Sequence, residues 1–251
     1  MTSGKADASY KFGAGRYLQC HGALELAGAE TGRFGHKAYV VGGPTALSIV
    51  RPRLQQSLTT AGLAFLTAVY PGAVCHEAAK VHAASARAAG CDVVVGVGGG
   101  RSMDFAKLVA FYLGSRVVNI PTSMATCAAY TPFSLVYTPQ GQTIPGNFSY
   151  DLEVAAILAD LDIMAHQPVR LVVAGMLDAM AKCLEIKSGY PDQPPAGSSL
   201  NFCAGYQLAQ FTWERLTALA EVARDDLGDT DREAKGRRPA GWVDDPKPLM
   251  M

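Results

Sequence analysis

The segment Asp92-Val-Val-Val-Gly-Val-Gly-Gly-Gly-Arg-Ser-Met-Asp-Phe-Ala-Lys107 decides the fold of this 251-residue chain. An apolar run leads into three consecutive glycines, Gly98, Gly99 and Gly100, and a helical pattern follows at once. Glycine permits positive φ and close backbone approach, and a helix N-terminus offers free N–H donors and the positive end of its dipole. These features suit a pyrophosphate, so the turn predicts a nucleotide site. A tight strand–helix turn without a ligand is the alternative interpretation.

The spacing of this turn differs from two familiar phosphate motifs. Arg101 stands where the Rossmann motif G-x-G-x-x-G has its last glycine. No G-K-S or G-K-T follows, so the turn is not a Walker loop either.

The sequence around the turn alternates strand and helix patterns. Strands are expected at Lys37–Val41, Ala64–Val69, Asp92–Val97, Arg116–Ile120 and Val154–Leu158, and helices at about 45–60, Cys75–Ala89 and Ser102–Leu113. Continuous apolar strands are typical of a parallel sheet with helices on both faces. With right-handed crossovers, the pattern predicts an α/β fold with a doubly wound parallel sheet.

The second half of the chain has a different pattern. Phe133–Thr138 and Thr143–Phe148 flank a Pro-Gln-Gly turn and predict a β-hairpin. Helices are expected at Val169–Lys187 and Leu200–Leu227, separated by a proline-rich loop. We therefore expect a dinucleotide-binding α/β domain over 1–165, a partial helical domain over 166–227 and a polar, disordered tail over 228–251.

Composition excludes several classes of protein. Hydrophobic residues make up 49% and charged residues 18%, which predicts a buried core and not a disordered or fibrous chain. The 22 Lys and Arg balance the 22 Asp and Glu, which argues against nucleic-acid partners. The longest apolar runs fall well short of the roughly 18–20 residues of a membrane span, and no signal peptide is visible. Six cysteines without a C-x-x-C pair predict no disulfide framework and a cytoplasmic location.

Three ordered blocks carry a resemblance to a known family. They are G-V-G-G-G-R-S-M-D-F-A-K from Gly96, I-P-T-S-M-A-T-C-A-A-Y-T-P-F-S-L-V-Y-T from Ile120, and P-V-R-L-V-V-A-G-M-L-D-A-M-A-K from Pro168. In order and spacing the chain resembles the iron-containing (group III) alcohol dehydrogenases, and within them the glycerol dehydrogenase and hydroxycarboxylate dehydrogenase branch.

The resemblance implies a cleft that holds NAD and a divalent metal, zinc or iron. The implied cofactor-binding residues are Gly98, Gly99 and Gly100 at the pyrophosphate, Arg101, Ser102 and Asp104 beside it, Thr122 and Thr126 along the cofactor, and Thr131, Phe133 and Tyr137 at the nicotinamide end. The alternative for the threonines is that their hydroxyls only cap the turn. Gly43 takes the place of the aspartate that often marks NAD preference, so NADP stays open.

Two further departures concern the substrate and the metal. Cys127 replaces the aspartate with which glycerol dehydrogenases contact the polyol, which favours an aldehyde, ketone or 2-oxo acid. The alternative is that Cys127 is a small buried hydrophobe. Asp178 matches the family's metal-binding carboxylate, with an ion pair to Lys182 as the alternative. The five histidines at 21, 36, 76, 82 and 166 all precede Asp178, so the family's histidine ligands are missing from this chain.

These observations predict an NAD(P)- and metal-dependent oxidoreductase acting on the CH–OH group of a small alcohol, polyol or 2-hydroxy acid. No residue is assigned as catalytic. The segment from Gly228 matches nothing in the family's pattern, which favours a truncated gene product over a short paralogue and puts turnover in doubt. The alternatives are an inactive nucleotide-binding fragment or interaction module and, more weakly, a branch similar to dehydroquinate synthase. The expected partner is a small-molecule alcohol or carbonyl, and a homo-oligomer stays open.

Overall fold

The structure is a computed structural model and describes residues 13–146 and 148–228. The predicted tail over 228–251 lies, apart from Gly228, outside the described residues. The chain divides into two compact units between Leu171 and Val172. This division falls a little after the predicted domain boundary at 165.

The first unit is built on a parallel sheet of six strands in the order β1-β8-β5-β4-β2-β3. The strands are β1 (Tyr17–Cys20), β2 (Lys37–Gly42), β3 (Ala64–Val69), β4 (Val93–Gly98), β5 (Arg116–Pro121) and β8 (Ala156–Asp160). The helices are α1 (Ala27–Thr31), α2 (Pro44–Thr60), α3 (His76–Ala88), α4 (Gly100–Leu113) and α5 (Leu161–Ala165), with short 3-10 turns η1 (Ala23–Leu26) and η2 (Cys127–Ala129).

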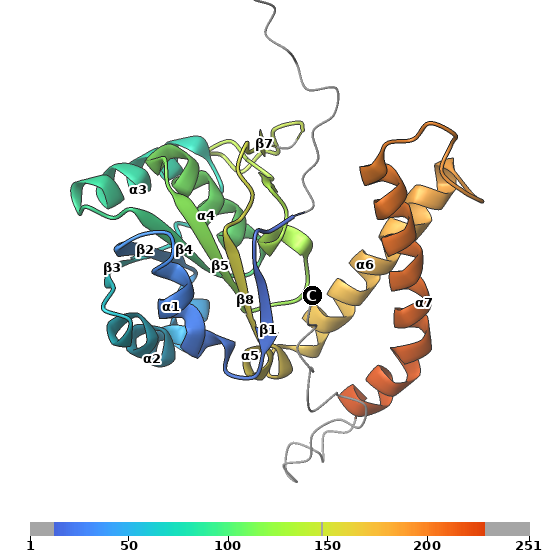
Figure 1. The fold of residues 1–251 in the computed structure, drawn as a ribbon, viewed down its shortest axis with the longest axis horizontal. Helices are drawn as coiled ribbons and strands as arrows, with labels where there is room; N and C mark the ends of the chain where they lie inside the picture. Colours follow the sequence, from blue (N-terminus) through green and yellow to red (C-terminus); the bar gives the residue numbers. More distant parts are fainter. Residues whose placement is uncertain (1–12, 147, 229–251) are drawn as a thin grey trace, which may run out of the picture. The chain divides into compact units, whose positions relative to one another are not determined.

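Helices cover both faces of this sheet, with α3 and α4 on one side and α1 and α2 on the other (Figure 1). Alternate residues of β2 supply the two cores. Tyr39 and Val41 join the cluster beneath α3 and α4, whereas Ala38 and Val40 join the cluster that contains Leu54 of α2. Side chains in a strand point to opposite faces in turn, so a strand that is apolar throughout needs cover on both sides. The predicted doubly wound α/β fold is confirmed.

The order of the central strands creates a switch point in the sheet. From β2 the chain crosses through α2 to β3 on one side, and from β3 it returns through α3 to β4 on the other side of β2. The carboxyl ends of β2 and β4 therefore lie side by side while the chain leaves them in opposite directions. Ligands of open α/β sheets bind in the crevice at such a point.

The predicted hairpin is present with short strands. β6 (Phe133–Ser134) pairs antiparallel with β7 (Phe148–Ser149), and one further bridge joins Tyr137 to Thr143. The predicted second strand, Thr143–Phe148, is mostly not strand. Pro145 has no N–H to give a ladder, and Gly146 has a positive φ of 87°, which explains the interruption.

The second unit consists of the greater part of α6 (Val169–Gly189) and of α7 (Leu200–Gly228), as the helical pattern predicts. Aromatic rings join the two helices near the loop between them. The rings of Tyr190 and Phe202 lie 5.1 Å apart, and the Tyr206 hydroxyl donates to the Pro191 carbonyl at 3.3 Å. Large apolar side chains on both helices are nevertheless exposed: Leu177, Leu184, Leu208 and Phe211.

Candidate functional site

The glycine turn after β4 combines one strained position with one open position. Gly98 has a positive φ of 137°, and a Cβ there would lie 2.8 Å from Ser102 Oγ. Gly99 is the N-cap of α4 in an extended conformation, and a Cβ there would meet nothing within 4 Å. The main chain at Gly99 therefore borders open space, as a phosphate cradle requires.

A second helix begins beside this turn, at the carboxyl end of β2. Gly43 is the N-cap of α2, and a Cβ there would lie 3.8 Å from Ser102 Oγ of α4. Neither α2 nor α4 has a side-chain cap or an acidic residue in its first turn. Two uncapped helix N-termini at the switch point attract negative charge, because the positive ends of both dipoles face the same place.

Arg101 and Tyr137, both predicted to contact the cofactor, are brought together by the fold. The Arg101 guanidinium lies 5.8 Å from the centre of the Tyr137 ring, within reach of a cation–π contact. Tyr137 is placed by its main-chain N–H, which donates to the Val74 carbonyl at 2.8 Å. This contact joins the first turn of α4 to the hairpin.

Among the described residues, the buried hydroxyls without a hydrogen-bond partner are those of Thr31, Tyr70 and Thr131, and the last two lie on segments that border the predicted site. Tyr70 follows β3, and its N–H donates to the carbonyl of Gly42 at 2.8 Å, which places it at the switch-point edge. Burial raises the pKa of Tyr70 to about 12, although the nearby Arg101 charge acts to lower it. Tyr70 is not among the residues predicted from the sequence, and an aromatic residue directly after a strand is the signal that marks it.

The loop after β5 carries the predicted threonines and Cys127. Thr122 N–H donates to the Gly98 carbonyl at 2.9 Å, and Thr126 Oγ1 accepts from the Ala128 N–H at 3.2 Å to cap η2. A Cβ at Gly100 would lie 2.9 Å from Thr126 Cγ2, so this loop packs directly on the start of α4. Cys127 is exposed, and the interpretation of Cys127 as a buried hydrophobe is therefore wrong.

Asp104 and Phe133 make contacts directed into the protein. The Asp104 carboxylate lies 2.9 Å from Lys107 Nζ and accepts from the Leu135 N–H at 3.2 Å. Burial raises the pKa of Asp104, while the Lys107 charge opposes this. The carbonyl of Phe133 also accepts a hydrogen bond from Lys107. Asp104 is thus engaged by internal partners, in contrast to the open main chain at Gly99.

The predicted metal ligand Asp178 is an exposed residue of α6. Its neighbour along the helix, Lys182, donates to both carboxylate oxygens of Glu185 at 3.0 and 3.2 Å. Within residues 13–146 and 148–228, no group of three or more His, Cys, Asp or Glu side chains is arranged to hold a metal ion. Each of the five histidines has a hydrogen-bonding neighbour, namely Asp162 for His21 and His166, Asp92 for His36, Tyr112 for His76 and Tyr39 for His82.

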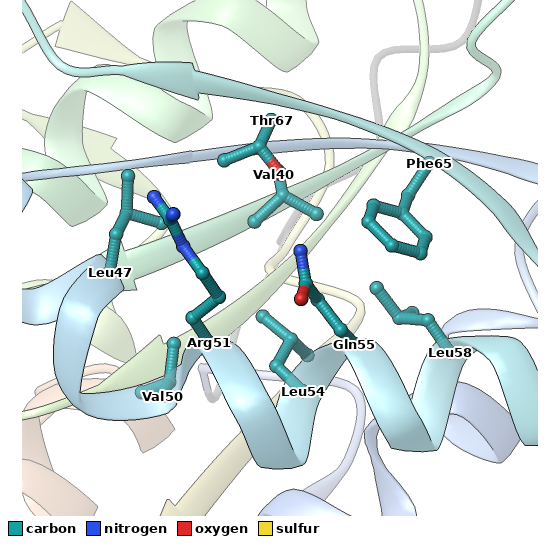
Figure 2. A pocket seen from close by; sticks show the side chains of 9 residues that line it. All are labelled: Val40, Leu47, Val50, Arg51, Leu54, Gln55, Leu58, Phe65 and Thr67. Carbon is teal, nitrogen blue, oxygen red and sulfur yellow. The ribbon is translucent and has the colours of Figure 1, made fainter.

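Two cavities lie away from the glycine turn. The first has a volume of about 10 Å³ and lies between α2 and the strands β2 and β3. Figure 2 shows Leu54 and Leu58 of α2 facing Val40 and Phe65 across it. That volume suits about one water molecule, not a ligand. The second, of about 310 Å³, lies at the C-terminal end of α4 and the start of β5 and is lined by Phe111, Arg116, Tyr150 and Glu153 among others.

None of the described helices combines the length and the apolar character that crossing a membrane requires.

Comparison with known proteins gives consistent matches. Residues 14–160 match the family description "Iron-containing alcohol dehydrogenase". The chain is 30% identical over 226 residues to a glycerol dehydrogenase of Thermotoga maritima, covering 84% of this chain and 57% of that protein. It is 25% identical over 203 residues to a glycolaldehyde reductase of Halobacterium salinarum, covering 80% of this chain and 55% of the relative.

Solved structures give the same result. The structure of a probable glycerol dehydrogenase from Sinorhizobium meliloti 1021 superposes with a TM-score of 0.73 at 27% identity, covering 85% of this chain and 58% of that one. The chain therefore spans little more than half the length of the relatives that it matches.

Proposed function

The chain belongs to the iron-containing alcohol dehydrogenase family, and from this premise we propose that it is a nicotinamide-dinucleotide-binding oxidoreductase acting on the CH–OH group of a small alcohol, polyol or 2-hydroxy acid. One observation carries the proposal. The main chain at Gly99 borders open space between the uncapped N-termini of α2 and α4. A pyrophosphate there accepts hydrogen bonds from main-chain N–H groups and meets two positive dipole ends.

The residues present fit a dinucleotide. Gly99 and Gly100 hold the pyrophosphate in this proposal, with Ser102 between the two helix starts and Arg101 in the first turn of α4. The loop with Thr126 and Thr131 extends along the cofactor toward the hairpin, where Thr131 keeps a buried hydroxyl without a partner among the described residues. The nicotinamide ring, when bound, supplies a hydride acceptor or donor. The first unit is, in this proposal, the dinucleotide-binding domain.

The choice between NAD and NADP depends on Gly43. A carboxylate at this N-cap would accept hydrogen bonds from an adenosine ribose and would repel a 2′-phosphate. Gly43 offers neither effect, and the first turn of α2 contains no acidic residue. We infer that the site admits both NADH and NADPH.

The substrate proposal rests on Cys127. Its side chain is exposed and uncharged on η2, in the loop that packs on the start of α4. Without a carboxylate, this position does not repel an anion, so the proposed substrates are aldehydes, ketones or 2-oxo acids in preference to glycerol. The glycolaldehyde reductase of Halobacterium salinarum is a relative whose name designates a carbonyl substrate.

A divalent metal, which the family implies, does not fit the residues that the structure describes. Asp178 belongs to no group of three or more potential metal ligands within residues 13–146 and 148–228, and zinc or iron sites use three or four protein ligands. This observation favours a second candidate function, a nucleotide-binding module without turnover. The two candidates share the dinucleotide site and differ in whether the chain holds a metal.

Titration with NADH tests the proposal directly. The nicotinamide fluorescence should change saturably with protein concentration. Gly99→Val should weaken binding at least tenfold, about 1.4 kcal/mol, because its side chain occupies the cradle. Gly205→Val on α7 is the matched control, since a Cβ at Gly205 also meets nothing within 4 Å. Absence of saturable binding, or equal NADH affinities in the wild type and Gly99→Val, would contradict the proposal.

A further inference from the structure

A buried lysine holds the loop that follows β5. Lys107 of α4 is 2% exposed, and its ammonium donates to the carbonyl oxygens of Ala128 at 2.8 Å, Thr131 at 3.1 Å and Phe133. The Asp104 carboxylate lies 2.9 Å from the same nitrogen. A buried charge is tolerated only when it is paired and hydrogen-bonded, and here both conditions are met.

A second buried side chain contacts the same loop from β5. Asn119 is fully buried, and its Nδ2 donates to the carbonyl of Ala129 at 2.9 Å. Four main-chain carbonyls of the segment 127–133 therefore accept hydrogen bonds from side chains of α4 and β5: those of Ala128, Ala129, Thr131 and Phe133.

The segment 127–133 has few main-chain hydrogen bonds of its own. The N–H groups of Tyr130 and Thr131 both donate to the carbonyl of Cys127, at 2.8 and 3.2 Å. A loop of this kind keeps one conformation only if other groups fix its polar atoms, because ordering each residue costs conformational entropy. The contacts of Lys107 and Asn119 provide that fixation.

Lys107 also lies on the helix that begins at the glycine turn. Two helical turns separate it from Gly100, so one rigid element carries both the phosphate cradle and the anchor of the loop. An ammonium suits this position, since it is compact and its three N–H donors are shared among the three carbonyls and the Asp104 carboxylate. Arginine would present a larger planar fork in the same enclosed space.

We propose that Lys107 is a positioning residue that fixes the segment 127–133, with Cys127 and Thr131, relative to the Gly98–Gly100 turn. Asn119 supports it by holding the middle of the segment. The proposal rests on the proposed function only for the identity of the ligand, because the placement of the segment is measurable without any ligand.

Lys107→Gln tests the role by hydrogen–deuterium exchange and NADH titration. Amides of the segment 127–133 should exchange roughly tenfold faster or more, because the carbonyl contacts and the charge are lost. Exchange in β4 should be unchanged, and NADH affinity should fall about fivefold or more.

Ser57→Ala is the matched control. The Ser57 hydroxyl is buried near α1, accepts from the Gly28 N–H at 2.9 Å and donates to the Glu25 carbonyl at 2.7 Å. Loss of the Ser57 hydroxyl should lower the stability of the first unit but removes no hydrogen bond to the segment 127–133. Exchange in that segment should therefore not rise selectively in this variant.

Two results would overturn the proposal. One is unchanged exchange of the segment 127–133 in folded Lys107→Gln. The other is a uniform rise across the first unit that matches Ser57→Ala, which would mean a general structural role. If Lys107→Gln does not fold, Asn119→Ala replaces it, and unchanged exchange in that variant overturns the proposal equally. Selective loosening of the loop in a protein that does not bind NADH would contradict the proposed function alone.

Discussion

The main-chain N–H of Thr122 donates to the carbonyl oxygen of Gly98 at 2.9 Å, which ties the residue after β5 to the last residue of β4. The Gly98 carbonyl accepts this hydrogen bond from a residue whose backbone has a positive φ of 137°. The glycine turn is therefore an extension of the sheet, fixed by a neighbouring strand, and its shape depends on Gly98 more than on the glycines after it.

Replacement of Gly98 should affect folding. Gly98→Ala forces a side chain into a positive φ and places its Cβ 2.8 Å from Ser102 Oγ. We expect the free energy of unfolding to fall by about 1–3 kcal/mol. Urea denaturation followed by circular dichroism measures this. Gly99→Ala, with an extended backbone and open space, serves as the control and should unfold like the wild type. Equal midpoints for the two variants would contradict the prediction.

A carboxylate at residue 43 should change the cofactor preference. Gly43 has φ −66° and ψ 151°, which any residue adopts, and a Cβ there has Ser102 Oγ at 3.8 Å as its nearest neighbour. Gly43→Asp should weaken NADPH binding relative to NADH by about tenfold or more, because the carboxylate repels a 2′-phosphate. Parallel fluorescence titrations measure the ratio. Gly43→Asn, which lacks the charge, should shift the ratio less, and equal shifts would argue against the electrostatic explanation.

Stability should depend on the ionisation of Asp162. A hydrogen bond from His21, with 2.7 Å between Nδ1 and Oδ1, lowers the pKa of Asp162, and the Gly22 N–H acts in the same direction. A carboxyl whose pKa is lower in the folded state stabilises the fold above its unfolded pKa of about 3.9 and loses this effect as the pH falls through the folded value.

Asp162→Asn should therefore lower the melting temperature at pH 7 by about 2–4 °C, for a partly exposed pair worth about 1 kcal/mol or less. The two melting temperatures should converge at a pH well below about 3.9. Differential scanning calorimetry from pH 2 to pH 8 tests this, with Asp151→Asn at an exposed position as the control. If the melting temperatures of the wild type and Asp162→Asn differed by the same amount at pH 2 as at pH 7, the ionised carboxylate would not be the cause of the difference.

The chain should carry no stoichiometric zinc or iron. Asp178 is an exposed carboxylate, and the described residues provide no cluster of ligands around it. We expect elemental analysis of the purified, unaggregated protein to find neither metal in proportion to protein, and EDTA to leave NADH binding unchanged. One ion per chain that EDTA removes together with NADH binding would mean that ligands come from outside the described residues.

The sequence predicts the central part of the fold because its signals are local. The apolar run of β4, the glycines and the helical pattern after them are adjacent, and the structure confirms their order. β1 is absent from the prediction, since Tyr17–Cys20 is too short to show a period and its partner β8 is distant in sequence. A run of three consecutive glycines also does not show which of them needs a positive φ. In the structure Gly98 has the positive φ, whereas Gly99 borders open space.

The candidate site is predictable only in part, for a related reason. Lys107 looks like an ordinary helical lysine next to Asp104, and its role depends on carbonyl groups that follow later in the chain. Main-chain carbonyls have no signature in a sequence. The exposure of Cys127 likewise depends on how the loop folds over α4 and not on the residue type.

The edge strand β1 has a consequence for synthesis on the ribosome. Tyr17 pairs with Ile157, so β1, the first of the described strands, has no partner until about 140 more residues have been made. At about 5–20 residues per second, this wait lasts roughly 7–28 s. During that time the nascent sheet β3-β2-β4-β5 grows from its middle, and the outer edge of β5 stays open until β8 arrives. Loop-closure entropy makes such a distant pairing slow, so we expect the docking of β8 and β1 to complete the co-translational folding of the first unit.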